Sequence, residues 1–320
     1  MEFRSVANLS RTVVFASDRI PVDIDLVVGV PRSGVLAGSL IALHRNLRLM
    51  DLDGFLAGGR AAVGRTAAAT VLSSEMPVRH ALIVDDSIAS GKSMRVVRDR
   101  VRQLAPDTRV TFLAIYGSKA THPEVDVVLE QVPMPRIFEW NLLRHNRLTD
   151  SCVAGEGVLF RNGLHLAEPA LLKPLVPVPH LIMRAPEIMR SDIENWLRDQ
   201  GIRYGRLWLC DEGGNEDRYN SYKAEIYLKT DCCLFIEGSK RDAAAVARES
   251  RRPVLSIASQ RVIWPDDDER AQLLYRERLL RKQNGWRSTA VVRVARSWLE
   301  KLQPAGAAQG RFGTDFDQKA

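Results

Sequence analysis

The stretch Leu82-Ile83-Val84-Asp85-Asp86-Ser87-Ile88-Ala89-Ser90-Gly91-Lys92-Ser93 decides the fold expected for the first half of this chain. Its apolar start, preceded by Ala81, predicts a short buried strand, and residues 93–104 have helical periodicity. Two acids and a run of small residues connect the strand to the helix. Because ligands of open α/β sheets bind at the carboxyl ends of the strands, we expect this connection to be a binding loop.

Further strands and helices alternate on both sides of this stretch. The expected strands are residues 25–30, 49–52, 81–84, 110–116 and 125–129, and the expected helices are residues 35–44 and 93–104. This alternation predicts a parallel, doubly wound α/β sheet. Residues 54–78 form a connection that is too long for an ordinary loop, and such loops are often functional.

The chemistry expected of the loop follows from its residue types. Backbone amides at the start of the helix, together with the serine hydroxyls, can form a cradle for an anion. Gly91 allows the backbone to approach a phosphate closely. The neighbouring carboxylates of Asp85 and Asp86 would repel that phosphate, so we expect them to face ribose hydroxyls and bound Mg²⁺.

Two alternatives compete with this interpretation of the loop. Gly91-Lys92-Ser93 also ends a Walker-type P-loop, but that motif requires a glycine where Asp86 stands, so we reject it. The other alternative is a surface turn that resembles a phosphate loop by chance. We favour this interpretation less than a binding loop.

The stretch resembles the signature of type I phosphoribosyltransferases, in particular those of the orotate phosphoribosyltransferase kind. That signature is four apolar residues, two acids, and a small-residue loop that carries glycine and ends in Ser or Thr. The resemblance implies that Asp85 and Asp86 hold the ribose hydroxyls of phosphoribosyl pyrophosphate and its Mg²⁺. The residues implied for binding the phosphate are Ser87, Ala89, Ser90, Gly91, Lys92 and Ser93.

Two other segments lie where this family has functional loops. Arg32, Ser33 and Gly34 follow the first strand, where the family binds pyrophosphate; a plain turn between strand and helix is the alternative. Arg60 and Arg65 lie in the long connection, where the family has a mobile catalytic loop; solvated charges are the alternative.

The segment Phe138-Glu139-Trp140-Asn141 lies where the family can place a base-binding hood. Trp140 could stack on a nitrogenous base and Asn141 could read its edge, although a core aromatic is an equal alternative. The implied reaction transfers phosphoribose through positioning and charge, and no catalytic base stands out. The residues implied for catalysis are Asp85, Asp86, Arg32, Arg60 and Arg65.

The second half restarts the alternation of strands and helices and predicts another Rossmann-like α/β domain. It resembles, more weakly, haloacid-dehalogenase-like domains, in Gly157-Val158-Leu159-Phe160, in Lys223 and in the segment ending at Glu237. Active members carry Asp-x-Asp where this chain has Ala154-Gly155-Glu156. Since Ala154 replaces the nucleophile, we predict a catalytically inactive domain.

The resulting domain prediction has four parts. Residues 1–147 form the phosphoribosyltransferase domain, 148–262 the degenerate domain, 263–303 an Arg-rich helical segment, and 304–320 a disordered tail. A helix from Ser191 to Gln200 is expected in the second part, with Ser191 as its N-cap and Gly201 after its end.

Composition limits the location and the partners. The four cysteines, which have no zinc-site spacing, predict buried thiols in a reducing compartment. No signal peptide and no membrane-spanning run is visible, so we expect a cytoplasmic protein that does not contact a membrane. The net charge of +7 suits anionic ligands, and without a recognition motif it does not favour nucleic acid.

Two functions remain open at this point. The first is a phosphoribosyltransferase acting on phosphoribosyl pyrophosphate and an orotate- or purine-like base. The second is a regulatory protein that senses phosphoribosyl pyrophosphate or a nucleotide and uses the inactive second domain for partner contacts. The sequence leaves the oligomeric state open, with a homodimer among the expectations.

Overall fold

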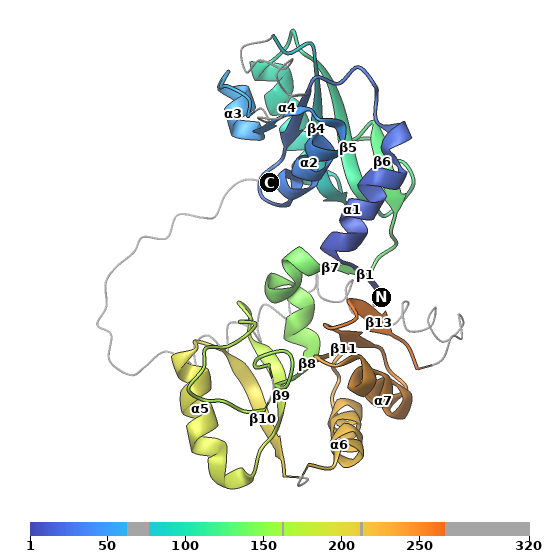
Figure 1. Ribbon diagram of the computed structural model, residues 1–320. Coiled ribbons are helices and arrows are strands. Elements are labelled where there is room, and N and C mark those ends of the chain that lie inside the picture. The colour runs from blue at the N-terminus through green and yellow to red at the C-terminus, as the bar shows by residue number, and fades with distance from the viewer. Residues whose placement is uncertain (63–76, 162, 212–213, 266–320) are drawn as a thin grey trace, which may run out of the picture. The chain divides into compact units, whose positions relative to one another are not determined.

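The computed structural model describes residues 1–62, 77–161, 163–211 and 214–265 (Figure 1). Several predictions fall outside these residues. They concern Arg65, most of the long connection, the Arg-rich segment beyond Pro265, and the tail.

A five-stranded sheet, parallel throughout, organises the first half of the chain. Its order is β3-β2-β4-β5-β6, with β4 at the centre. The bounds are β2 Leu26–Gly29, β3 Arg48–Asp51, β4 His80–Ile88, β5 Arg109–Gly117 and β6 Val127–Gln131. All five strands expected from the sequence are present, within a few residues of their predicted ends.

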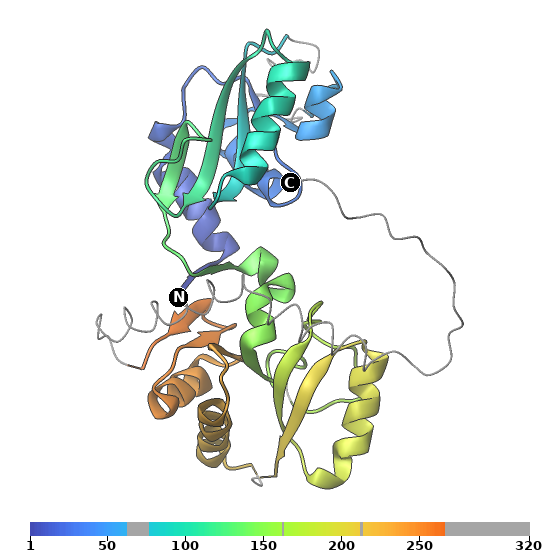
Figure 2. The same ribbon diagram turned by 180° about the vertical axis from the view of Figure 1, so that it is seen from behind.

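Helices cover both faces of this sheet, as a buried parallel sheet requires. On one face, α1 (Val6–Phe15) and α2 (Ser33–Arg45) pack on a core that includes Leu82 and Val84 (Figure 1). On the other, α3 (Leu52–Leu56) and α4 (Lys92–Leu104) pack on a core that includes Ile83 (Figure 2). The two cores take alternate residues of β4, because successive side chains of a strand point to opposite faces.

The central strand β4 is longer than the sequence suggests. It continues past Val84 because Asp85 pairs with Ala114, and Ser87 with Tyr116, on the neighbouring β5. Both acids are therefore part of the strand, and the loop that follows it is short, from Ala89 to the N-cap Gly91.

A small two-stranded sheet introduces the segment around Trp140. Strand β1 (Glu2–Arg4) pairs in parallel with β7 (Arg136–Phe138), and a 3-10 helix, Glu139–Arg144, follows directly. Phe138 belongs to the same buried core as Leu82 and Val84 of the large sheet.

A second sheet organises the other half, in the order β10-β9-β8-β11-β12-β13. Its strands are β8 Ser151–Ala154, β9 Val178–Arg184, β10 Tyr204–Cys210, β11 Leu234–Glu237, β12 Val254–Ser256 and β13 Arg261–Ile263. All neighbours pair in parallel except β12 and β13. The helices are α5 Arg190–Asp199, α6 Glu216–Lys229 and α7 Lys240–Ser250. The prediction of an α/β protein with parallel sheets is confirmed, while the domain boundaries stay predictions.

The start of α5 differs from the sequence-based expectation. The helix begins at Arg190 and its N-cap is Met189, with no side-chain cap, so Ser191 lies inside the first turn. The end is as expected, since Gly201 follows with the left-handed φ of 66°. Arg190, the first residue of the helix, forms ion pairs with Glu187 and Glu194.

Two expectations from composition concern features that the structure shows directly. All four cysteines lie in described residues and are buried outside any disulfide, as predicted. Within the described ranges, no helix has the length and apolar character needed to cross a membrane.

Candidate functional site

The acid pair lies at the carboxyl end of the central strand. Asp86 is 5% exposed and Asp85 is half-buried, and the Asp86 amide donates a hydrogen bond of 2.9 Å to Asp85 Oδ1. Burial, and then the charge of Asp86, raises the pKa of Asp85 from 3.8 to about 7. The pair therefore binds a proton near neutral pH, and a bound cation would compete with that proton.

The structure connects Asp86 to the segment proposed as a base-binding hood. Trp140 Nε1 donates a 2.6 Å hydrogen bond to Asp86 Oδ2. The indole ring stacks on Phe138, with 4.9 Å between ring centroids and 4° between the planes. Trp140 is thus partly a core aromatic and partly a polar contact of the acid pair.

Arg136 is a residue of this site that the sequence analysis missed. Its guanidinium is 6% exposed and donates to the carbonyls of Ile88, at 2.8 Å, and Val132, at 2.9 Å. Burial lowers the pKa of Arg136, and the charge of Asp86 opposes this shift. In the sequence, Arg136 is marked only by its place two residues before Phe138, where the segment proposed as a base-binding hood begins.

The loop after β4 presents an open helix terminus. Ala89 and Ser90 are exposed, and Gly91 is the N-cap of α4 with a φ of 74°. A Cβ at Gly91 would lie 2.3 Å from His122 Cε1, so the position requires glycine both for its conformation and for space. Within the described residues, α4 has neither a side-chain cap nor an acid in its first turn, which leaves its amides available to an anion.

The loop after β2 reaches the same edge of the sheet. Gly34 packs so closely that a Cβ there would lie 2.4 Å from the Val84 carbonyl oxygen and 3.2 Å from Asp85 Oδ1. Arg32 is exposed, and its Nη2 donates to Asn141 Oδ1 at 3.2 Å. The structure therefore places the loop 32–34 next to the acid pair and the segment around Trp140.

Among the described residues, Arg60 is not part of this cluster. Arg60 lines a cavity of about 670 Å³ with Arg48, Phe55 and Pro77, and neither acid nor the loop after β4 lines it. Arg65 lies outside the described residues.

Asp85 and Asp86 are the residues that could hold a metal. The described part of the chain contains no group of three or more His, Cys, Asp or Glu side chains suited to a metal ion. Mg²⁺, however, is commonly held by one or two carboxylates together with water and substrate phosphates. The two acids therefore fit an ion that is carried in with a phosphorylated ligand.

In the second half, the residues at the position of the predicted degenerate haloacid-dehalogenase-like motif contact one another or the backbone. Ala154 ends β8, and Glu156 accepts hydrogen bonds from the Arg184 amide, at 2.8 Å, and from the Tyr219 hydroxyl, at 2.7 Å. Lys223 Nζ lies 2.7 Å from Glu237 Oε2, and both side chains are at most 2% exposed. Glu156, Lys223 and Glu237 are thus each engaged by another group of the protein.

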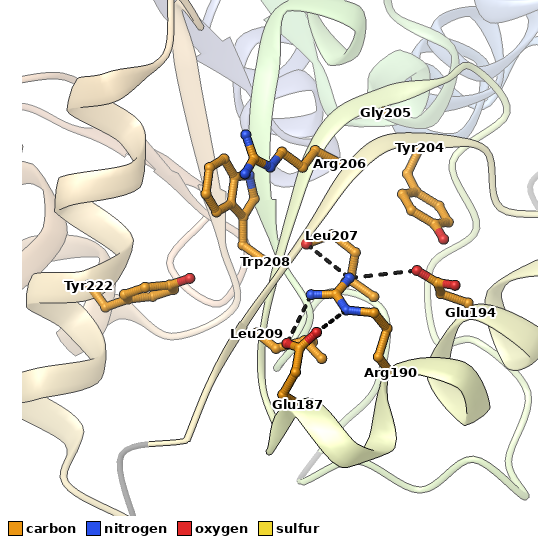
Figure 3. Close-up of a pocket in the computed structure, with 10 residues that line it drawn as sticks. All are labelled: Glu187, Arg190, Glu194, Tyr204, Gly205, Arg206, Leu207, Trp208, Leu209 and Tyr222. Carbon is orange, nitrogen blue, oxygen red and sulfur yellow. Dashed lines mark hydrogen bonds and ion pairs between the residues drawn. The ribbon is translucent and has the colours of Figure 1, made fainter.

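A separate cavity of about 600 Å³ runs along β10 (Figure 3). Its charged side chains are paired: Arg190 contacts Glu187 and Glu194, and the Arg206 guanidinium lies 3.8 Å from the centroid of the Trp208 ring. None of the residues predicted for either site lines this cavity. We therefore assign the candidate site to the acid pair and its loop.

The first half thus contains a parallel α/β sheet with a candidate anion- and cation-binding site at its carboxyl edge. No family model and no curated protein matches the sequence. Similar solved structures include the xanthine-guanine-hypoxanthine phosphoribosyltransferase of Helicobacter pylori (18% identity, TM-score 0.32, 45% of this chain and 97% of that one). Others are a purine phosphoribosyltransferase of Pyrococcus horikoshii (16%, 0.30, 43% and 92%) and a hypothetical protein of Neisseria gonorrhoeae with bound ppGpp (10%, 0.32, 44% and 89%).

The stability of the protein is expected to depend on pH through Asp85. Because the native state keeps a proton on Asp85 up to about pH 7, whereas the unfolded chain releases it near 3.8, stability should fall as the pH rises through that window. Asp85→Asn removes this contribution and should flatten the profile. Urea unfolding across the window, with the exposed Asp107→Asn as the control, measures the effect. Equal slopes in Asp85→Asn and the unchanged protein would contradict the shift.

Proposed function

We propose that the first half is a phosphoribosyltransferase domain that binds phosphoribosyl pyrophosphate with Mg²⁺ and transfers phosphoribose to or from a nitrogenous base. The observation that carries the proposal is the pairing of two features at one edge of the sheet. Two carboxylates end the central strand, and the uncapped N-terminus of α4 follows within a few residues. The first feature suits a ribose with its metal, and the second suits a phosphate.

Each part of the ligand has a place in this proposal. Asp85 and Asp86 bind the ribose hydroxyls, and the amides and hydroxyls of residues 89–93 bind the 5′-phosphate. Arg32, Ser33 and Gly34 bind the pyrophosphate, and the free face of Trp140 receives the base. When bound, Mg²⁺ neutralises the departing pyrophosphate.

Two measurements test this function. Isothermal titration with phosphoribosyl pyrophosphate and Mg²⁺ measures binding, and pyrophosphate release across purine and pyrimidine bases measures turnover. We expect both binding and release with at least one base. Absence of binding would overturn the proposal.

A sensing role is the second candidate, and the replacement of the nucleophile by Ala154 in the other half favours it. A protein that has lost one catalytic centre and kept a ligand site could serve in regulation. Tight binding of phosphoribosyl pyrophosphate without pyrophosphate release on the full base panel would support this role over catalysis.

For the second half, we infer a haloacid-dehalogenase-like domain without phosphatase activity. Ala154 offers no nucleophile, and Glu156 is engaged by Arg184 and Tyr219. The purified protein is expected to release no phosphate from generic phosphomonoesters in the presence of Mg²⁺. Turnover that requires Mg²⁺ and disappears in Glu156→Gln would overturn the inference.

The setting of the protein is also a proposal. A cytoplasmic location is supported by the four buried cysteines, which form no disulfide, as is usual in a reducing compartment. A homodimer stays a proposal as well, and light scattering on the purified protein tests it.

A further inference from the structure

The Trp140 ring is held in its orientation by two other aromatic rings, Phe138 and Tyr116. Tyr116, Phe138 and Trp140 form a stack, with 5.3 Å between the first two ring centroids and 4.9 Å between the last two. Tyr116 and Phe138 are buried, so the indole rests on a rigid surface. Its N–H is thereby directed at Asp86 Oδ2, 2.6 Å away.

This hydrogen bond fixes one oxygen of a buried carboxylate. Asp86 is 5% exposed, and its Oδ2 is occupied by the indole N–H. Among the residues that the structure describes, Oδ1 has only a long contact, 3.5 Å, from the Ser87 hydroxyl. A carboxylate held at one oxygen presents the other in a defined direction, which a freely rotating group does not.

The same short segment contacts both ligand-binding loops. Trp140 holds Asp86 at the end of β4, and the next residue, Asn141, accepts a hydrogen bond from Arg32 in the loop after β2. Arg136, at the start of the same segment, donates to the Ile88 carbonyl, just before the phosphate loop. One stretch of chain, Arg136–Asn141, therefore connects all three parts of the site.

We propose that Trp140 is a positioning residue: its indole N–H orients the Asp86 carboxylate for the ribose and couples the base-binding segment to the acid pair. The inference rests on the proposed function and extends it, because it assigns to Trp140 a role that base stacking does not require. A base stacked on the free face of Trp140 and a ribose bound to Asp86 would then contact the same side chain from two directions.

Removal of the N–H alone tests the proposal. Trp140→Phe keeps an aromatic ring on Phe138 and loses the donor. Replacement of Trp140 by 3-benzothienylalanine keeps the bicyclic shape as well. In both variants we expect binding of phosphoribosyl pyrophosphate with Mg²⁺, measured by isothermal titration, to weaken about 10-fold to 100-fold, the usual effect of losing a hydrogen bond to a charged group.

The bicyclic variant separates positioning from general structural support. 3-Benzothienylalanine fills the same space on Phe138 as tryptophan and lacks only the N–H donor. If Trp140 served packing alone, this variant would bind phosphoribosyl pyrophosphate as tightly as the unchanged protein. A positioning role instead predicts weaker binding in both variants.

A matched control exists in the second half. Trp208 Nε1 donates to His180 Nδ1 at 3.2 Å, far from the acid pair in the sequence and on the other sheet, so Trp208→Phe should leave the affinity unchanged. If the unchanged protein binds no phosphoribosyl pyrophosphate, the proposed function fails. If it binds and the benzothienyl variant has the same affinity, the role of Trp140 is overturned and the proposed function stands.

Discussion

Binding of phosphoribosyl pyrophosphate and Mg²⁺ is expected to be weaker by at least about 1–3 kcal/mol in Asp85→Asn/Asp86→Asn than in the unchanged protein. Both carboxylates lie at the carboxyl end of β4, where they would accept charge-assisted hydrogen bonds from the ribose and contact its metal. The amides retain the shape of the acids and lose the charge. Isothermal titration at fixed pH and Mg²⁺ concentration measures the difference.

Two checks make this result specific. Asp99→Asn/Asp107→Asn removes the same number of charges from exposed positions in the first half, and it should leave affinity nearly unchanged. Circular dichroism of each variant shows whether the fold is retained. Unchanged affinity in the Asp85/Asp86 variant would mean that the loop does not bind the ribose.

The second large effect is expected on stability. Lys223→Met should lower the free energy of unfolding by about 3–5 kcal/mol, because it leaves the Glu237 carboxylate buried without its ion-pair partner. The pKa of Glu237 is already raised, chiefly by burial, which shows how costly its charge is at this position. Urea unfolding followed by circular dichroism measures the loss.

Companion variants define the cause of that loss. Lys223→Met/Glu237→Gln removes both charges and should recover much of the stability. Lys229→Met breaks a similar pair with Glu225 that is more than half exposed, and it should cost no more than about 0.5 kcal/mol. A double variant as unstable as Lys223→Met would show that packing, rather than the unpaired charge, accounts for the effect.

The sequence predicted the alternating architecture well because its signals are local. A parallel strand buried on both faces is a short apolar run, and the run before Asp85 has that form. The strand β13 and the helix α1 were missed. The first has only three residues, and the second begins with a Ser5–Asn8 capping box that uses Asn in place of the usual Glu or Gln.

The candidate site was only partly visible in the sequence. Gly91 was identified as a place of close approach and Gly34 as part of the pyrophosphate loop. A Cβ at Gly34 would lie 2.4 Å from the Val84 carbonyl oxygen, and one at Gly91 would lie 2.3 Å from His122 Cε1. Arg136 was missed because nothing local distinguishes a buried arginine from a solvated one. Arg60 lines another cavity. Its position in the long connection gave no sign of this, because the sequence does not show which way that connection runs.

The sequence by itself determined the order of the elements and the composition of the loop Asp85–Ser93, because strand, acids, glycine and helix are consecutive along the chain. Only the tertiary structure decided what surrounds that loop. The hydrogen bond from Trp140 to Asp86 joins residues that are 54 positions apart, and the contact of Arg136 with Ile88 joins residues 48 apart. Such pairings depend on how the sheet and its flanking segments pack, and no local pattern encodes them.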